Sequence, residues 1–174
     1  DMALLFWSGL PLTARKIWWW RIWKGRWIAA IMCVITKAQE LSVCASSHQG
    51  CLLCGGSNPC SLQLSFQDTA EGGVRAEFQT RRVMQGYPGI LHGGVSASLL
   101  DAAMTNCLFH RGIQAYTADL HVRYLHPIPC PAQLEIKAWI VSEYASLYQL
   151  RSEISRNQQV MARGEGKFVL CKGV

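Results

Sequence analysis

Hydrophobic and polar residues alternate along much of the chain, a period of two that is typical of β-strands with one buried face. After a Gly-Gly pair, Val74, Ala76 and Phe78 alternate with polar residues and predict one such strand. A shorter strand is expected over residues 62–66. Four longer strands joined by short turns are expected over residues 116–125, 133–143, 146–155 and 159–170. Consecutive strands with short turns pair in an antiparallel sheet.

One long segment follows a different pattern and predicts a helix over residues 95–109. Apolar residues cover most of its circumference, so this helix is expected to be buried. The preceding Gln-Gly-Tyr-Pro-Gly stretch, residues 85–89, is not expected to form regular structure. The order of elements therefore predicts an α+β domain, in which a curved antiparallel sheet wraps around one central helix.

Composition divides the chain into residues 1–47 and residues 48–174. The first segment holds six of the seven tryptophans, together with six Lys/Arg and two acidic residues, a net charge of +4. Only +2 of the chain's +6 is left for the body, which is long enough for one domain with a core. A nearly neutral body without a basic face argues against nucleic-acid binding.

The basic, tryptophan-rich segment has three interpretations. Its longest uncharged apolar run, residues 27–36, is about half the roughly 20 residues that a membrane span requires. A basic amphipathic helix on a membrane surface, or an organelle-targeting leader, fits better. A non-native extension fits equally well. A membrane surface is thus expected as a partner only through residues 1–47.

Eight cysteines are present, and Cys33, Cys107 and Cys171 lie in apolar runs where a free thiol behaves as a small buried hydrophobe. This favours a reducing compartment, and we expect a cytoplasmic location. The alternative is an organelle or a membrane surface, if the leading segment is native.

A second group of cysteines lies in one loop, where the spacing of His48, Cys51, Cys54 and Cys60 is compatible with a zinc knuckle. This is the main non-enzymatic interpretation. Only one Cys-x-x-Cys pair is present, and we expect no metal. A redox role is set aside, because thioredoxin-like motifs begin a helix and this one precedes a Gly/Ser/Asn/Pro loop.

Asp101 lies in the middle of the apolar helix, where a carboxylate is costly unless it is hydrogen-bonded or paired. General-base or nucleophilic chemistry would explain it, as would a buried structural hydrogen bond. The turn His92-Gly93-Gly94 precedes the helix, whose first N–H groups lack intrahelical partners and favour negative charge. That turn is either an oxyanion hole or simply a tight turn, and His92 alone is more typical of a structural histidine.

His92 and Asp101 are nine residues apart, about two and a half helical turns. Both side chains cannot touch one atom from a single helix. A site that uses both would require a second subunit.

Residues 85–104, QGYPGILHGGVSASLLDAAM, resemble the signature of the hot-dog-fold thioesterase superfamily, particularly the phenylacetyl-CoA-thioesterase-like and thioesterase-superfamily-member branch. CLLCGGSNPCSLQLSF, residues 51–66, is similar to the opening loop of that branch, and TADLHVRYLHPIP, residues 117–129, to the strand after its helix. The resemblance covers roughly residues 48–172. It implies a hot-dog fold and a homodimer with one continuous sheet, in which the turn of one protomer faces the helix carboxylate of its partner.

The resemblance also implies the activity of an acyl-CoA thioesterase, which hydrolyses acyl-coenzyme A to a free acid and coenzyme A. Asp101 would activate water or attack the thioester directly, while Gly94, with Gly93, would polarise the carbonyl. His92 would orient the turn, and Thr117 matches a hydroxyl residue that assists the water. Gln85 is a further catalytic candidate, near the position where some relatives place an asparagine.

No cofactor or metal is expected, because a thiolate leaves readily and coenzyme A belongs to the substrate. Four residues are candidate liners of the acyl tunnel: Met84, Tyr87, Leu100 and Tyr124. Five arginines could meet the phosphates of coenzyme A, and the sequence favours none of them: Arg81, Arg82, Arg123, Arg151 and Arg163. A tetramer is the larger assembly to expect. The alternatives are a non-catalytic acyl-CoA-binding hot-dog module and a hot-dog dehydratase.

Overall fold

The computed structural model describes residues 48–171. The leading segment 1–47 and its three interpretations lie outside the described residues, as do residues 172–174. Over the described part, no helix combines the length and apolar character needed to cross a membrane.

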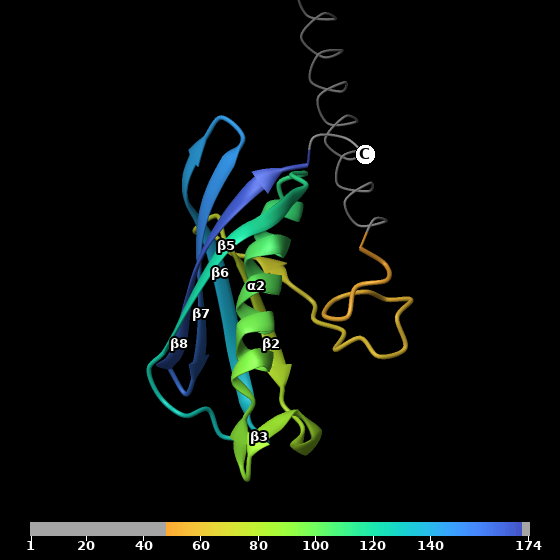
Figure 1. Ribbon diagram of the computed structural model, residues 1–174, viewed down its shortest axis with the longest axis vertical. Helices are drawn as coiled ribbons and strands as arrows, with labels where there is room; N and C mark the ends of the chain where they lie inside the picture. Colours follow the sequence, from red (N-terminus) through yellow and green to blue (C-terminus); the bar gives the residue numbers. More distant parts are fainter. Residues whose placement is uncertain (1–47, 172–174) are drawn as a thin grey trace, which may run out of the picture. The chain divides into compact units, whose positions relative to one another are not determined.

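One long helix and a six-stranded antiparallel sheet make up the domain (Figure 1). The strands lie in the order β1-β2-β6-β7-β8-β5, so the two edges are β1 and β5. The sheet elements are β1 (Gln67–Asp68), β2 (Val74–Gln79), β5 (Ala115–Tyr124), β6 (Gln133–Tyr144), β7 (Leu147–Arg156) and β8 (Gln159–Leu170). The helix α2 spans Gly93–Phe109, and a short 3-10 helix spans Arg82–Met84. The predicted α+β architecture is confirmed.

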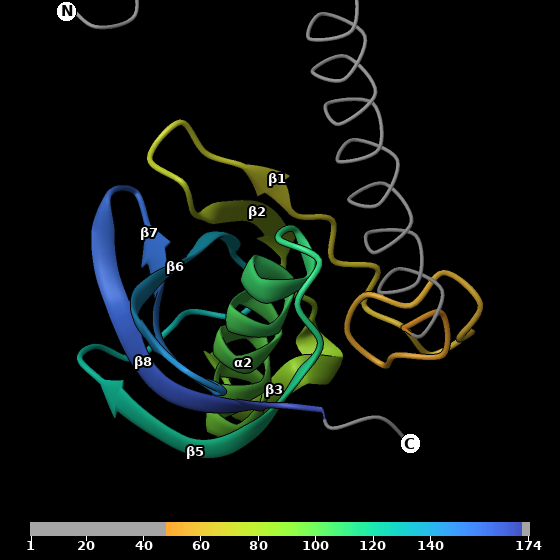
Figure 2. The same cartoon turned by 90° about the horizontal axis from the view of Figure 1, so that it is seen from above.

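The sheet curves around α2 because its strands bury alternate residues against the helix (Figure 2). In β2 every second residue is buried, and β7 and β8 show the same alternation over most of their length. The four long strands begin and end within one residue of the predicted positions. A period of two locates β6, β7 and β8 well because each has one face turned to the core. The edge strand β5 buries only Ala115 and half-buries Leu120 and Val122.

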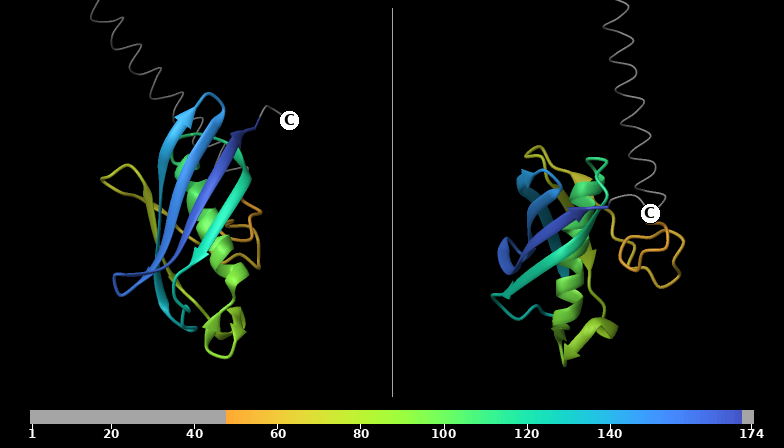
Figure 3. Two further views of the ribbon diagram at one scale, coloured as in Figure 1. Left: turned by 60° about the vertical axis from the view of Figure 1, so that its left-hand side comes forward. Right: turned by 45° about the horizontal axis from the view of Figure 1, so that its top comes forward.

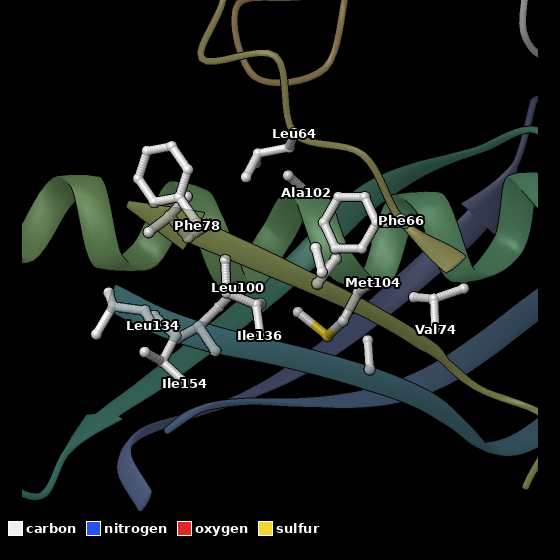
Figure 4. Packing of buried hydrophobic residues seen from close by; sticks show 14 of the residues in the cluster. Leu64, Phe66, Val74, Phe78, Leu100, Ala102, Met104, Leu134, Ile136 and Ile154 are labelled. Carbon is white, nitrogen blue, oxygen red and sulfur yellow. The ribbon is translucent and has the colours of Figure 1, made fainter. Parts of the chain in front are cut away.

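The core is centred on α2, which begins at Gly93, two residues earlier than predicted. Leu99, Leu100 and Leu108 are completely buried, as expected of a helix that is apolar over most of its circumference. In Figure 4, Leu100 meets side chains of the sheet, whereas Leu64 approaches α2 from the opening segment. The helix is therefore covered by the sheet and, on another side, by residues that precede β1.

Close packing between α2 and the sheet depends on Gly164 in β8. A Cβ atom at this position would lie 2.6 Å from the Ser152 hydroxyl and 3.2 Å from the Leu100 Cβ. Only glycine lets the strand backbone approach the helix this closely.

The strand predicted over residues 62–66 is wrong. Those residues form no strand, and the first strand, β1, contains only Gln67 and Asp68. Leu64 and Phe66 are buried and alternate with exposed residues, but here the alternation belongs to a loop that packs against the core. The N–H of Leu64 donates to the Leu53 carbonyl within that loop. Alternation indicates one buried face without requiring a sheet partner.

The expectation that residues 85–89 form no regular structure is also wrong. Gln85–Tyr87 forms β3, which pairs with β4 (Ile90–Leu91) in a separate two-stranded sheet. Figure 3 shows this small hairpin beyond the N-terminal end of α2. Gly89, with φ of 75°, makes the turn that a Pro-Gly pair permits. The hairpin delivers the chain into the first turn of the helix.

Candidate active site

Asp101 lies in the middle of α2 and is half-buried, with one specific partner. The Thr117 hydroxyl donates a hydrogen bond to Asp101 Oδ1 at 2.8 Å. Burial raises the pKa of the Asp101 carboxyl, and the Thr117 hydrogen bond offsets part of that rise. The other carboxylate oxygen has no hydrogen bond within residues 48–171 and is free to meet a water or a substrate atom.

Thr117 is exposed and lies on β5, where the strand departs from regular pairing. Thr117 pairs with Phe168 and Asp119 with Lys167, so the register shifts around Ala118. Bulges of this kind re-aim side chains and are frequent next to active sites. The structure thus brings together Asp101 and Thr117, which are 16 residues apart in the sequence.

The His92 turn is a helix cap. His92 is the N-cap of α2, and its Nδ1 accepts a hydrogen bond from the Gly94 N–H at 2.9 Å. An accepting Nδ1 requires a neutral ring with its proton on Nε2. His92 therefore caps the helix through its ring, and its role in catalysis stays a prediction. The Gly94 N–H is engaged by the ring, whereas the N–H groups of Gly93 and Val95 have no acceptor among the described residues.

Tyr124, at the end of β5, braces the same turn. Its hydroxyl donates to the Gly93 carbonyl at 2.8 Å. Tyr124 and Gly93 also line a groove of about 280 Å³ between the start of α2 and the chain after β5. Tyr124 was a candidate liner on sequence grounds, and its hydrogen bond to the turn had no signal in the sequence because the partners are 31 residues apart.

The other candidates lie around the β3–β4 hairpin or in the core. The Gln85 side chain accepts from the Gly89 N–H at 3.2 Å and so closes the hairpin turn. Tyr87 is exposed on β3, Met84 is buried, and Leu100 is completely buried. Met84 and Leu100 are thus core residues of the described chain, and their lining of an acyl tunnel stays a prediction.

Two of the five candidate arginines are already paired with acids. Arg151 pairs with Glu165 at 3.0 Å and Arg163 with Glu153 at 2.8 Å. The remaining three make no ion pair within residues 48–171: Arg81, Arg82 and Arg123.

The opening loop brings together part of the possible zinc knuckle. The ligand atoms of His48, Cys51 and Cys54 lie within 4.8 Å of one another, and Cys60 does not belong to this group. Burial raises the pKa of the Cys54 thiol to about 11. A protonated thiol is a poor nucleophile, which agrees with setting aside the redox interpretation.

The glycine turn at the start of α2 and the Asp101 carboxylate belong to the same helix but are separated along its axis. Seven residues separate Gly94 from Asp101, roughly 10 Å along the helix axis. A single thioester carbonyl cannot contact both within one protomer. The domain is therefore an α+β protein with two separated half-sites, an N-terminal helix turn and a half-buried carboxylate with a hydroxyl partner.

Comparison with known proteins gives a family model and several relatives that match part of the chain. The family model described as "Thioesterase superfamily" matches residues 88–161. Acyl-coenzyme A thioesterase THEM4 of Rattus norvegicus is 39% identical over 64 residues, which are 37% of this chain and 27% of that protein. Acyl-coenzyme A thioesterase THEM5 of Homo sapiens is 30% identical over 106 residues, 60% of this chain and 42% of that protein.

Among solved structures, the crystal structure of a thioesterase superfamily protein superposes with a TM-score of 0.63 and 30% identity. The match covers 66% of this chain and 60% of that one. Residues 88–161 thus match the thioesterase superfamily, and the described domain has the hot-dog fold. The matches to THEM4 and THEM5 span less than half the length of those relatives.

Proposed function

We propose that this protein hydrolyses acyl-coenzyme A, with Asp101 as the catalytic carboxylate. The observation that carries the proposal is the half-buried Asp101, which accepts a hydrogen bond from Thr117 through one oxygen and leaves the other available. A carboxylate held in an apolar helix is costly for stability, and catalysis gives a reason for it. The names of the similar acyl-coenzyme A thioesterases support this choice of substrate.

In the proposed reaction the free oxygen of Asp101 takes a proton from water, and the water oxygen attacks the thioester carbonyl. The tetrahedral intermediate then collapses, the carbon–sulfur bond breaks, and coenzyme A leaves as a thiolate that picks up a proton. Direct attack by Asp101, followed by hydrolysis of the anhydride, gives the same products. Both routes require an ionised Asp101, which the Thr117 hydrogen bond favours.

The helix start of α2 supplies the polarising donors in this proposal. Because the Gly94 N–H donates to His92 Nδ1, Gly94 can serve a carbonyl only if that donor is shared or the His92 ring rotates away. The N–H groups of Gly93 and Val95 point from the same positive end of the helix without an acceptor in the described chain. We propose that the turn as a whole, rather than Gly94 alone, stabilises the oxyanion.

The two half-sites meet if two copies associate through β5. This strand is the sheet edge and pairs only with β8 in the described domain (Figure 2). It carries the exposed side chains of Tyr116 and Tyr124. A long edge strand with unpaired backbone groups is a template for another strand. Pairing of β5 with β5 of a second copy would continue the sheet and place Thr117 and Asp101 near the partner's helix turn. The active unit is then a homodimer.

The test is release of free thiol from short, long and aromatic acyl-CoAs by the purified full chain. Asp101→Asn should lower turnover by about 10²–10⁴-fold, the usual contribution of a positioned base. Glu71→Gln, an exposed acid in the β1–β2 turn, is the matched control and should be fully active. The dimer is checked on the same samples by light scattering.

Whether Asp101→Asn is folded can be judged by comparing its melting temperature with that of the wild type. Because burial raises the pKa of Asp101, ionising it destabilises the fold as pH rises through that pKa. The neutral amide avoids this cost, so Asp101→Asn should melt no lower than the wild type at pH 8. Full activity of a folded Asp101→Asn would remove Asp101 from the mechanism. Failure of the wild type to turn over any substrate, despite binding acyl-CoA, would favour a non-catalytic binding module.

A further inference from the structure

A second potential site lies in the opening loop, beside the C-terminal half of α2. The His48 Nδ1 and the Cys54 Sγ are 3.4 Å apart, and the Cys51 sulfur completes a group of three whose atoms all lie within 4.8 Å. Tetrahedral zinc with Zn–S of about 2.3 Å and Zn–N of about 2.0 Å holds its ligand atoms roughly 3.5–3.8 Å apart. The spacing of the three side chains is close to this requirement.

The local backbone is folded so that these side chains converge. The Cys51 N–H donates to the His48 carbonyl and the Gly55 N–H to the Cys51 carbonyl, each at 3.0 Å. A Cβ at Gly55 would lie 2.4 Å from both the Cys51 nitrogen and the Gln49 carbonyl oxygen, so the turn accepts only glycine. The Leu53 N–H points at the Cys51 sulfur at 3.3 Å. Such N–H donors stabilise a metal-bound thiolate.

The helix supports the same group from the other side. The Asn106 amide donates to the Cys54 sulfur at 3.7 Å and to the Ala102 carbonyl at 2.8 Å. The His48 ring packs edge-on against Phe109, with centroids 4.6 Å apart. Both contacts come from side chains of α2 and orient a possible ligand, as the outer partners of metal ligands do.

The fourth coordination position of such a metal ion would face solvent. His48, Cys54 and Asn106 line a cavity of about 490 Å³ between the loop and the end of α2. Cys60, the fourth residue of the sequence pattern, is exposed and does not join the group. Three protein ligands and an open position are the arrangement in which zinc retains a water.

We propose that His48, Cys51 and Cys54 bind one zinc ion that holds the opening loop in its folded conformation beside α2. Thiolate and imidazole ligands in tetrahedral geometry favour zinc over hard cations such as magnesium. Binding converts two thiols to thiolates and releases two protons, and no oxidant or reductant takes part. The fourth ligand is a water in the cavity. This site is separate from Asp101 and does not depend on the proposed hydrolase activity.

The first measurement is the zinc content of the full chain purified without chelator. The wild type should hold one zinc per chain, and Cys51→Ser, Cys54→Ser and His48→Ala should each lose most of it. Cys60→Ser is the matched control, a thiol in the same loop that should leave the zinc content unchanged. Removal of zinc from the wild type should lower Tm by several degrees, because binding stabilises only the folded loop.

A second measurement keeps the test independent of variants that fail to fold. Cobalt added to the zinc-free wild type should give thiolate charge-transfer absorption in the near ultraviolet and the visible bands of tetrahedral cobalt. Loss of zinc in Cys60→Ser would overturn the ligand set. A wild type that holds no zinc and gives no cobalt spectrum would overturn the site, as would a Cys51–Cys54 disulfide in the unreduced protein.

Discussion

Replacement of Thr117 by valine tests the contact on which the candidate active site depends. Valine keeps the β-branched shape of threonine, so β5 should keep its conformation and only the hydroxyl is lost. The 2.8 Å hydrogen bond to Asp101 Oδ1 disappears. Thr117→Ser is the matched control because it retains the hydroxyl.

The expected magnitude follows from the exposure of Thr117. A hydrogen bond to a charged group contributes about 1.5–3 kcal/mol, and water can partly replace an exposed one, so the lower end applies. About 1.5 kcal/mol corresponds to roughly a tenfold loss of kcat. KM should change little, because the Thr117 hydroxyl is engaged by the Asp101 carboxylate.

The pH dependence carries a defined sign. The Thr117 hydrogen bond lowers the pKa of Asp101, so its removal raises that pKa further. The ionised, active carboxylate is then reached only at higher pH, and the acidic limb of the kcat profile should move upward. If kcat of Thr117→Val returns to the wild-type value on the alkaline plateau, Thr117 acts through the pKa of Asp101. If kcat stays low on that plateau, Thr117 also holds the attacking water.

The assay is thiol release over a pH series for the wild type, Thr117→Val and Thr117→Ser. Serine should stay within a few-fold of the wild type with the same acidic limb. An unchanged rate and an unchanged pH profile in a folded Thr117→Val would refute the argument. Equal losses in Thr117→Val and Thr117→Ser would show that packing in β5 matters and the hydroxyl does not.

Two further predictions concern how the half-sites are held. His92→Ala should lower the free energy of unfolding by about 1 kcal/mol through loss of the cap on Gly94, and His92→Asn should recover most of it; equal values in denaturant titrations would contradict the capping role. Gly164→Ala should destabilise by about 1–3 kcal/mol, because its Cβ would press on Ser152 and Leu100. Gly50→Ala, where a Cβ meets no atom within 4 Å, should be nearly neutral, and equal melting temperatures for the two variants would count against close packing of α2 on β8.

Local patterns were sufficient for most of the fold and insufficient for two short elements. Alternation located β6, β7 and β8 because each turns one face to the core, but the same alternation over residues 62–66 belongs to a loop. The Pro-Gly stretch after Gln85 was expected to be irregular, and it forms a hairpin because β3 finds a partner in β4. In both cases the missing information was the presence or absence of a pairing strand, which a single-sequence pattern does not contain.

Patterns along the chain were enough to predict the buried helix, the unusual position of Asp101 inside it, and the glycine turn after His92. These follow from chain-local periodicity, burial and the unsatisfied N–H groups of a helix start. Three contacts became visible only in the folded domain. Thr117 donates to Asp101, Tyr124 donates to the Gly93 carbonyl, and His48 lies beside Cys51 and Cys54. The distance between the residues in each of these contacts is set by the folding of the loop or the sheet. A side-chain hydrogen bond also requires its atoms to be placed to within a few tenths of an ångström, and periodicity does not encode that placement.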